Sequence, residues 1–307
     1  MKLIWRTPDD FRFTTAVCSH GFFALAPNQW DPETRTLTTT VWANEVALTV
    51  RIRAVAAGAA LQIDVPGLRT MSPGPRRALR AAVRRILRLD ESLADFQARC
   101  AAGPDAGLAV AGEVRFGRLL RSASLFEDVV KTLCTCNITW RQTLTMVDRL
   151  VQRYGAEAVN DGRHRAFPGA DRLAAVDPQR LRTDVGLGYR ADWVQGLAAD
   201  VAEGRLDLNA LEDPNRPADD LYQRLRRIKG VGDYAASTLC ILLGRYDRLA
   251  VDSVLMDHYR RRYPRRRATP KLSARHYARY APYQALVYWW ELWQRHADAG
   301  GYPDGWT

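Results

Sequence analysis

The stretch that decides the fold of the second half of the chain is residues 228–234, which read IKGVGDY. An amphipathic pattern that places Leu221 and Leu225 on one helical face ends here, and a second apolar helix pattern runs from Ala235 to Leu243. Two short helices joined by Gly-x-Gly leave free backbone N–H groups at a helix N-terminus, and the glycines let an anion come close. The sequence therefore predicts a helical hairpin that holds a phosphate without a charged side chain.

A carboxylate follows this hairpin. Asp252 lies 20 residues after Gly232, just past the second predicted helix, in the sequence LAVD. A carboxylate beside a phosphate-binding hairpin suits chemistry on a sugar of a DNA backbone, because it can stabilise positive charge on that sugar. Asp252 is also placed to cap a helix that starts at Ser253, and the two roles are compatible. The hairpin alone leaves a plain DNA-binding element equally open.

Composition favours a polyanionic partner. The 307 residues include 45 Lys and Arg against 34 Asp and Glu, a formal net charge of +11, although a solvated basic surface would give the same count. The five cysteines are scattered, without a zinc-binding pair, and suit a reducing compartment. No apolar stretch is long enough to span a bilayer, so we expect a cytoplasmic protein without membrane contact.

Hydrophobic periodicity divides the chain into two parts. Residues 1–70 read as strands and turns, with Val46, Leu48, Val50 and Ile52 alternating, and residues 76–89 show a helical pattern. A linker rich in Gly and Ala at 101–107 precedes helical patterns that continue through the rest of the chain. We therefore expect an α+β protein. A mixed N-terminal domain at 1–100, an antiparallel sheet plus a helix, precedes an all-helical domain at 101–307.

Further stretches of the helical part match one family in order. They are RLLR at 118–121, TCN at 135–137, FP at 167–168, LGYRA at 187–191 and APYQAL at 281–286. Together with the hairpin and Asp252, they resemble the helix-hairpin-helix superfamily of DNA glycosylases. The resemblance is to the branch that contains 8-oxoguanine DNA glycosylase and the inducible bacterial 3-methyladenine DNA glycosylase, and it covers nearly all of residues 115–293.

The resemblance implies how DNA would be held. A base inside a duplex must be extruded before it can be cleaved. Tyr189 would wedge into the stack, Asn137 would fill the hole left by the base, and Arg190 would contact the widowed partner. Taken singly, these side chains could equally be a core aromatic, a helix cap and a surface cation. The hairpin residues that would hold phosphate are Gly230, Val231 and Gly232, with Lys229 beside them.

The same resemblance implies a reaction. Asp252 would stabilise the oxocarbenium-like sugar and position or deprotonate a water molecule. Bifunctional members carry a lysine two residues after the second glycine, where this chain has Tyr234. We therefore expect a monofunctional enzyme that leaves an intact abasic site without lyase activity. Lys229 lies on the other side of the glycines, and a lyase that uses it is the alternative.

The base pocket is less constrained. The resemblance places Tyr234 and Tyr283 at its wall and Thr238 one helical turn after Tyr234. His20 and Phe22, in the stretch CSHGF, match a pocket loop more weakly, and His20 also suits a structural role. The aromatic run at 288–293 is expected to be mostly core.

The remaining expectations concern cofactors, partners and rival functions. No cysteine follows Cys240, so the C-terminal iron–sulfur cluster of some relatives is not expected. The one metal site that the family implies is a monovalent cation, sodium or potassium, at the carbonyls of Gly230 and Gly232. The partner would be double-stranded DNA with a modified base, bound by a monomer in the bacterial cytoplasm and nucleoid. Removal of modified bases from foreign (phage) DNA, or a non-catalytic module that binds DNA damage, are the alternative functions.

Overall fold

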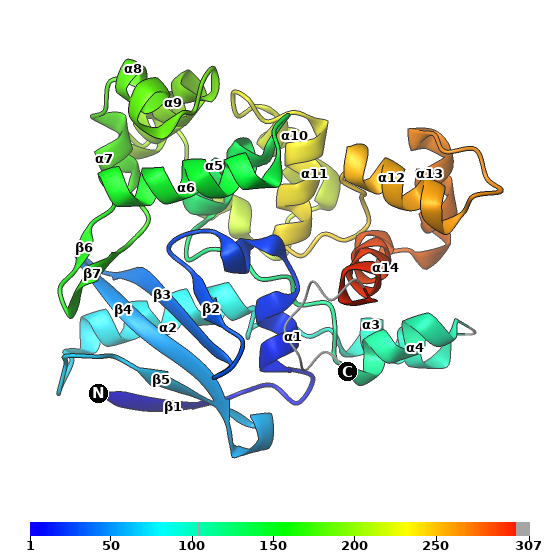
Figure 1. The fold of residues 1–307 in the computed structure, drawn as a ribbon, viewed down its shortest axis with the longest axis horizontal. Helices are drawn as coiled ribbons and strands as arrows, with labels where there is room; N and C mark the ends of the chain where they lie inside the picture. The colour runs from blue at the N-terminus through cyan, green and yellow to red at the C-terminus, as the bar shows by residue number, and fades with distance from the viewer. Residues whose placement is uncertain (104, 299–307) are drawn as a thin grey trace.

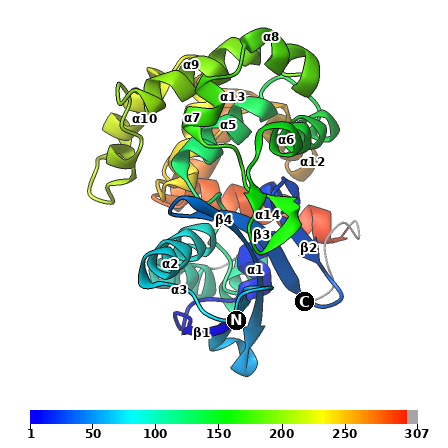
Figure 2. The ribbon, with the colours of Figure 1, turned by 90° about the vertical axis from the view of Figure 1, so that its left-hand side faces the viewer.

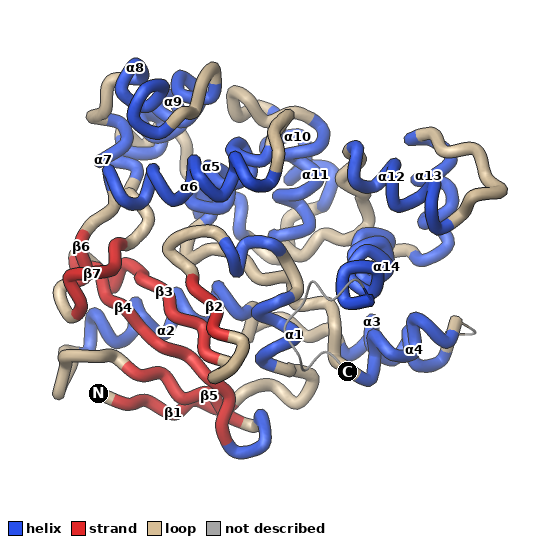
Figure 3. The backbone as a smooth tube through the Cα atoms, viewed as in Figure 1, coloured by secondary structure: helices blue, strands red, loops and turns tan. Residues whose placement is uncertain are grey.

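The computed structural model describes residues 1–103 and 105–298 and has the expected α+β architecture (Figures 1 and 3). A five-stranded antiparallel sheet has the order β1-β5-β4-β3-β2. Its strands are β1 (Lys2–Arg6), β2 (Gln29–Asp31), β3 (Thr36–Ala43), β4 (Val46–Val55) and β5 (Ala60–Asp64). Short helical turns flank them at α1 (Phe13–Cys18), η1 (Gly21–Ala24) and η2 (Ala56–Gly58).

The period-two pattern explains how the sheet is covered. Leu48, Val50 and Ile52 of β4 are buried, whereas Arg51 and Arg53, on either side of Ile52, are exposed. Helix α2 (Pro73–Leu87) contributes Leu79, Val83 and Ile86 to the same core. It begins three residues before the predicted helix because a proline suits the first helical turn.

A second small sheet ties the helical part to the first sheet. It consists of β6 (Glu157–Ala158) and β7 (Asp161–Arg165), which contact β4. Between them, the Asn160 side chain accepts a hydrogen bond from the Thr49 N–H at 2.9 Å and donates one to the Thr49 carbonyl at 2.8 Å. The amide side chain thus replaces a strand neighbour at that position.

The remaining elements are helical. They are α3 (Ala94–Ala102), α4 (Ala106–Glu113), α5 (Leu125–Thr135), α6 (Trp140–Tyr154), α7 (Ala170–Ala174), α8 (Pro178–Arg180), η3 (Leu181–Val185), α9 (Arg190–Ala202), η4 (Asn209–Glu212), α10 (Ala218–Arg226), α11 (Asp233–Leu242), α12 (Ser253–Arg262), α13 (Pro270–Tyr277), η5 (Ala278–Tyr280) and α14 (Gln284–Asp298). None of these described helices is long and apolar enough to cross a bilayer.

Two buried cores organise the described residues, and they do not divide the chain at residue 100. The first core joins the sheet, α2 and α3 to residues 241–293, and the second is built from residues 22–25 and 125–243. Helix α14 accordingly lies between the sheet side and the upper helices (Figure 2). The predicted linker begins inside α3, and its residue 104 lies outside the described residues. The domain boundary itself stays a prediction.

Candidate active site and nucleic-acid interface

The Gly-x-Gly hairpin joins α10 to α11 as predicted, and its two glycines have different reasons to be glycine. Gly230 has φ +90°, and a Cβ there would lie 2.5 Å from the ring of Trp193 in α9. Gly232 has an ordinary φ of −80° and caps α11 at the exposed surface, where an added Cβ would meet nothing within 4 Å. Gly230 therefore shapes the hairpin, whereas Gly232 leaves room for a ligand at the start of α11.

Asp252 is held at the start of α12. Its Oδ1 accepts a hydrogen bond from the Leu255 N–H at 2.7 Å, so the expected helix cap is present. Burial raises the pKa of the carboxyl above its usual 3.8, although the N–H groups of Leu255 and Val254 act in the opposite direction. Asp252 is thus a partly buried carboxylate fixed by backbone groups.

Tyr234 of α11 faces this carboxylate. Burial, followed by the negative charge of Asp252, raises the pKa of the Tyr234 hydroxyl, which lies beside the hydroxyls of Thr135 and Thr238. Among the described residues, Tyr234 is the one partly buried side chain that packs against both cores. The structure therefore brings Tyr234, Thr238 and Asp252 together at the junction of the two halves.

Tyr288 joins this group, with Trp289 as its neighbour in α14, although the sequence did not single them out. Tyr288 is buried in α14, and burial followed by the charges of Asp252 and Tyr234 raises the pKa of its hydroxyl well above 10. Trp289 is its neighbour and contacts the ring of His20 at 5.2 Å. The aromatic run at 288–293 was the available signal, but a run of bulky aromatic residues does not reveal which members face Asp252.

His20 is a neutral structural histidine. It is buried, its Nδ1 lies 3.2 Å from the Leu120 carbonyl, and its ring contacts Phe22 at 4.4 Å. Burial lowers the pKa of the imidazole to about 4. His20 and Phe22 therefore support the aromatic side of the site through Trp289 without adding charge to it.

Tyr283 lies elsewhere than predicted. Its hydroxyl donates a hydrogen bond to Asp95 Oδ2 at 2.9 Å, and its ring contacts Phe96 at 5.2 Å and Tyr246 at 6.3 Å. These contacts direct the side chain toward α3, so it is not among the groups around Asp252. Tyr283 immediately precedes α14, and the sequence could not show the direction of its side chain.

The predicted wedge and gap-filling residues are both exposed. Tyr189 is 48% exposed at the start of α9 and packs edge-on against Trp193, with ring centroids 4.8 Å apart. Asn137 is exposed in the loop between α5 and α6, with φ +50°, a conformation that asparagine tolerates better than most residues. Because Trp193 also lies against Gly230, the Tyr189 side chain is supported from the hairpin side.

Arg190 corrects the prediction of a DNA contact. It is 4% exposed, and its guanidinium donates to the carbonyls of Leu133, at 3.1 Å, and of Cys136. It thus bonds the end of α5 and the loop that carries Asn137. A buried guanidinium occupied by backbone carbonyls is not available to a widowed base, so Arg190 holds the loop in place.

We expect Arg190→Ala to loosen the Asn137 loop because it leaves buried carbonyls unpaired, at about 1–3 kcal/mol of unfolding free energy. Hydrogen exchange of the amides at 133–139 should accelerate, and affinity for duplex DNA should fall. Arg190→Lys should recover only part of both, since an ammonium cannot bond the two carbonyls as a planar fork. If DNA binding weakened while hydrogen exchange at 133–139 stayed unchanged, the result would favour the predicted direct contact between Arg190 and DNA.

The monovalent cation is predicted to bind at carbonyls of the hairpin, and it stays a prediction. The Gly232 carbonyl already accepts the Ala236 N–H at 2.9 Å. The Val231 carbonyl accepts a hydrogen bond from Arg226 Nη1 at 2.9 Å, and Arg226 Nε lies 3.0 Å from Asp233. At the Val231 carbonyl, positive charge therefore comes from Arg226 of α10. Lys229 is exposed beside the hairpin.

Comparison with known proteins identifies the fold. No protein-family model matches the chain. Similar solved structures include MBOgg1 bound to a low-affinity DNA ligand, with TM-score 0.75, 19% identity, and coverage of 97% of this chain and 96% of that one. The 3-methyladenine DNA glycosylase of Archaeoglobus fulgidus has TM-score 0.74 and 17% identity, over 95% and 98%. An 8-oxoguanine glycosylase/lyase of Clostridium acetobutylicum has TM-score 0.71 and 14% identity, over 95% of both.

This chain has the fold of the helix-hairpin-helix DNA glycosylases along nearly its whole length. Within that fold, the similar structures are 8-oxoguanine and 3-methyladenine glycosylases, the two kinds that define the branch the sequence resembles. At these identities the likeness concerns the fold, and the reaction has to be argued from the site.

Proposed function

We propose that the protein is a monofunctional DNA glycosylase that flips a damaged or modified base out of duplex DNA and hydrolyses its N-glycosidic bond. The observation that carries the proposal is the Asp252 carboxylate, fixed at the start of α12 beside Tyr234 and Tyr288. A free helix N-terminus at Gly232 lies on the same helix as Tyr234, within three residues of it. Helix α11 thus carries both the proposed phosphate site, at its N-terminus, and Tyr234, which lies beside the carboxylate that would act on the sugar.

Extrusion of the base would use the exposed side chains. Unstacking and unpairing cost a few kcal/mol, which must be offset by groups that fill the gap. Tyr189 presents an aromatic surface for the stack, and Asn137 presents donors and acceptors in a loop that Arg190 holds. The N–H groups at Gly232, with Lys229 beside them, would bind the phosphates of the distorted strand.

Cleavage would use Asp252. As the bond between C1′ and the base breaks, the base takes the electron pair and the sugar becomes an oxocarbenium-like cation. The Asp252 carboxylate would stabilise that cation and orient water for attack at C1′. The oxygen of water then bonds to C1′ and loses one proton, which goes to the departing base or, when a cationic base leaves as a neutral molecule, to the medium. An abasic site with a C1′ hydroxyl remains.

Tyr234 supports the absence of lyase activity. Lyase chemistry needs an amine that attacks C1′ to form a Schiff base. A phenol occupies the position where bifunctional members carry that amine, and burial with the charge of Asp252 raises its pKa, so it stays neutral. Because one of the similar structures is a glycosylase/lyase, the fold does not decide this point, and the proposal rests on the residue at 234.

The aromatic surroundings favour an alkylated purine as the substrate. Tyr234 and Tyr288 lie near Asp252, Trp289 contacts the Tyr288 ring, and His20, which contacts Trp289, is neutral. Electron-poor or cationic bases bind well to aromatic faces, whereas an oxidised base requires specific hydrogen-bond partners. Alkylated purines are therefore the first substrates to test.

The test is base release from duplexes that each carry one alkylated, deaminated, oxidised or bulky modified base. We expect strand breaks at the alkylated base only after hot alkali, and no covalent adduct on borohydride treatment. Breaks without alkali, together with an adduct that Lys229→Ala abolishes, would show a lyase and contradict the argument from Tyr234. No release from any duplex, with tight binding retained, would favour a damage-binding module.

A further inference from the structure

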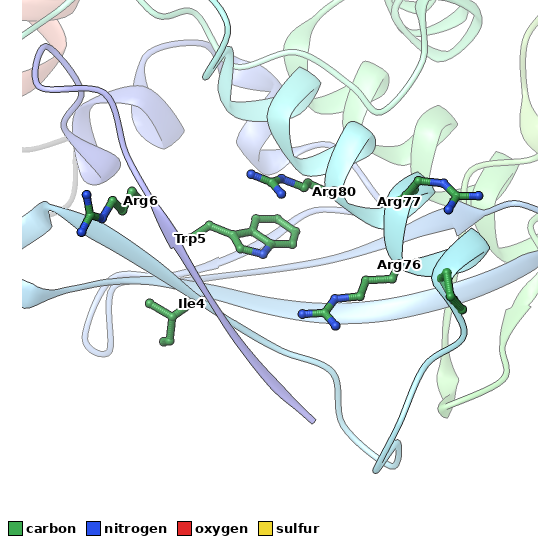
Figure 4. Close-up of a pocket in the computed structure, with 7 residues that line it drawn as sticks. Ile4, Trp5, Arg6, Arg76, Arg77 and Arg80 are labelled. Atoms are coloured by element: carbon green, nitrogen blue, oxygen red, sulfur yellow. The ribbon is translucent and has the colours of Figure 1, made fainter.

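A basic hollow lies between β1 and α2, on the sheet side of the molecule (Figures 1 and 4). It has a volume of about 580 Å³ and is lined by Ile4, Trp5, Arg6, Pro73, Arg76, Arg77 and Arg80. No carboxylate lines it. In Figure 4, Trp5 points from β1 toward α2 with Arg76 and Arg80 on either side, while Arg77 points away.

The arginines of this hollow differ from the other arginines of the same helix. Arg84, Arg85 and Arg88 are paired with Asp90, with Asp128 and Glu212, and with Glu91. Within residues 1–103 and 105–298, by contrast, neither Arg76, Arg77 nor Arg80 forms an ion pair. The last turns of α2 are therefore neutralised internally, whereas its first turns present uncompensated positive charge.

This positive charge destabilises α2 when no anion is bound to it. Arg76 and Arg80 are four residues apart on one face, where like charges repel. Both arginines and Arg77 lie in the first half of α2, whose first turn contains no acidic residue and whose N-cap, Ser72, makes no side-chain bond to the helix. Positive side chains near a helix N-terminus oppose its dipole. A bound anion would relieve all three effects.

The hollow also offers apolar surface and continues as a groove. The Arg80 guanidinium lies over the Trp5 ring, 5.9 Å from its centroid, and Ile4 is 61% exposed at the rim. A second hollow of about 210 Å³ shares Trp5, Arg6 and Arg80 and extends to Arg84 and Leu89. A ligand that matched this surface would be extended and anionic, with a flat apolar part.

We propose that this groove binds single-stranded DNA, with its phosphates on Arg76 and Arg80 and a base against Trp5. A track of basic side chains with an aromatic platform is the chemistry that binds unpaired strands, because the base face is free to stack. In a duplex that face is covered, and an acidic peptide would not use Trp5. The groove lies on β1, an edge strand, away from α10 and α11, which carry the hairpin (Figure 1).

The test is fluorescence anisotropy of a labelled oligothymidylate with the full chain, over a series of salt concentrations. Arg76→Ala/Arg80→Ala should weaken binding at least about tenfold and reduce the salt slope by about 1.4, since each phosphate contact on a single strand contributes about 0.7. Trp5→Ala should weaken binding with an unchanged slope. The matched control is Arg51→Ala/Arg53→Ala, two exposed arginines of β4 in the same sheet, with an expected change below about twofold.

Two outcomes would overturn the proposal. One is single-strand binding that is equal in the groove variants and the control. The other is an equal loss of duplex binding, which would place the groove on the duplex path. Base release from a lesion-containing duplex should be unchanged in the groove variants, and because the single-strand measurement requires no base release, it stands whether or not the protein is a glycosylase.

Discussion

Asp252→Asn is expected to reduce base release by at least about a hundredfold, the scale set by losing one preorganised electrostatic group at a developing charge. DNA binding should be retained, because asparagine keeps the shape of the side chain and still caps α12 through its carbonyl oxygen. Single-turnover kinetics with saturating enzyme, together with a binding titration, would separate the two effects. Base release that survives this substitution would assign the chemistry to another carboxylate.

The same substitution should stabilise the fold at neutral pH. Burial raises the pKa of Asp252, so the folded chain binds this proton more tightly than the unfolded chain. This group therefore stabilises the fold most when protonated, and that contribution is lost as the pH rises through the raised pKa. Asp252→Asn should thus raise Tm at pH 7, whereas Asp252→Ala loses the cap, at about 1 kcal/mol. Base release by the natural chain should decline on acidification at a pH above 3.8.

Gly230→Ala is expected to cost at least about 2 kcal/mol of unfolding free energy. At φ +90° the backbone of a residue with a Cβ is strained. The added Cβ would also lie 2.5 Å from the Trp193 ring. Since Trp193 supports Tyr189, the displaced ring should also move the wedge and weaken duplex binding. Chemical denaturation and a duplex titration would measure both.

Gly232→Ala is the matched control. Its backbone is unstrained and nothing lies within 4 Å of an added Cβ, so stability should change by less than about 0.5 kcal/mol. DNA affinity should still fall if a phosphate approaches this surface. Trp193→Ala in the Gly230→Ala background should recover the part of the loss due to the clash. Equal stability of the two glycine variants would contradict the different roles assigned to them.

Local patterns predicted the parts of the site that are near one another in the chain. The hairpin, the Asp252 cap and the facing pair Tyr234 and Thr238 follow from spacing within 25 residues. The errors concern side-chain direction set by distant segments. Arg190 turns inward because carbonyls more than 50 residues earlier accept its bonds, and Tyr283 turns toward Asp95, 188 residues away. Periodicity contains no information on such partners.

The sharing of the first core between the start and the end of the chain has a consequence for biosynthesis. The sheet and α2 bury their apolar faces together with residues of α14, which are made after all the other buried members of this core. Domains commonly fold during synthesis, N-terminal part first. Here the first core must wait for α14 to leave the ribosome, whereas the second core, built mainly from residues 125–243, can close earlier. We therefore expect the middle of this chain to fold before its beginning.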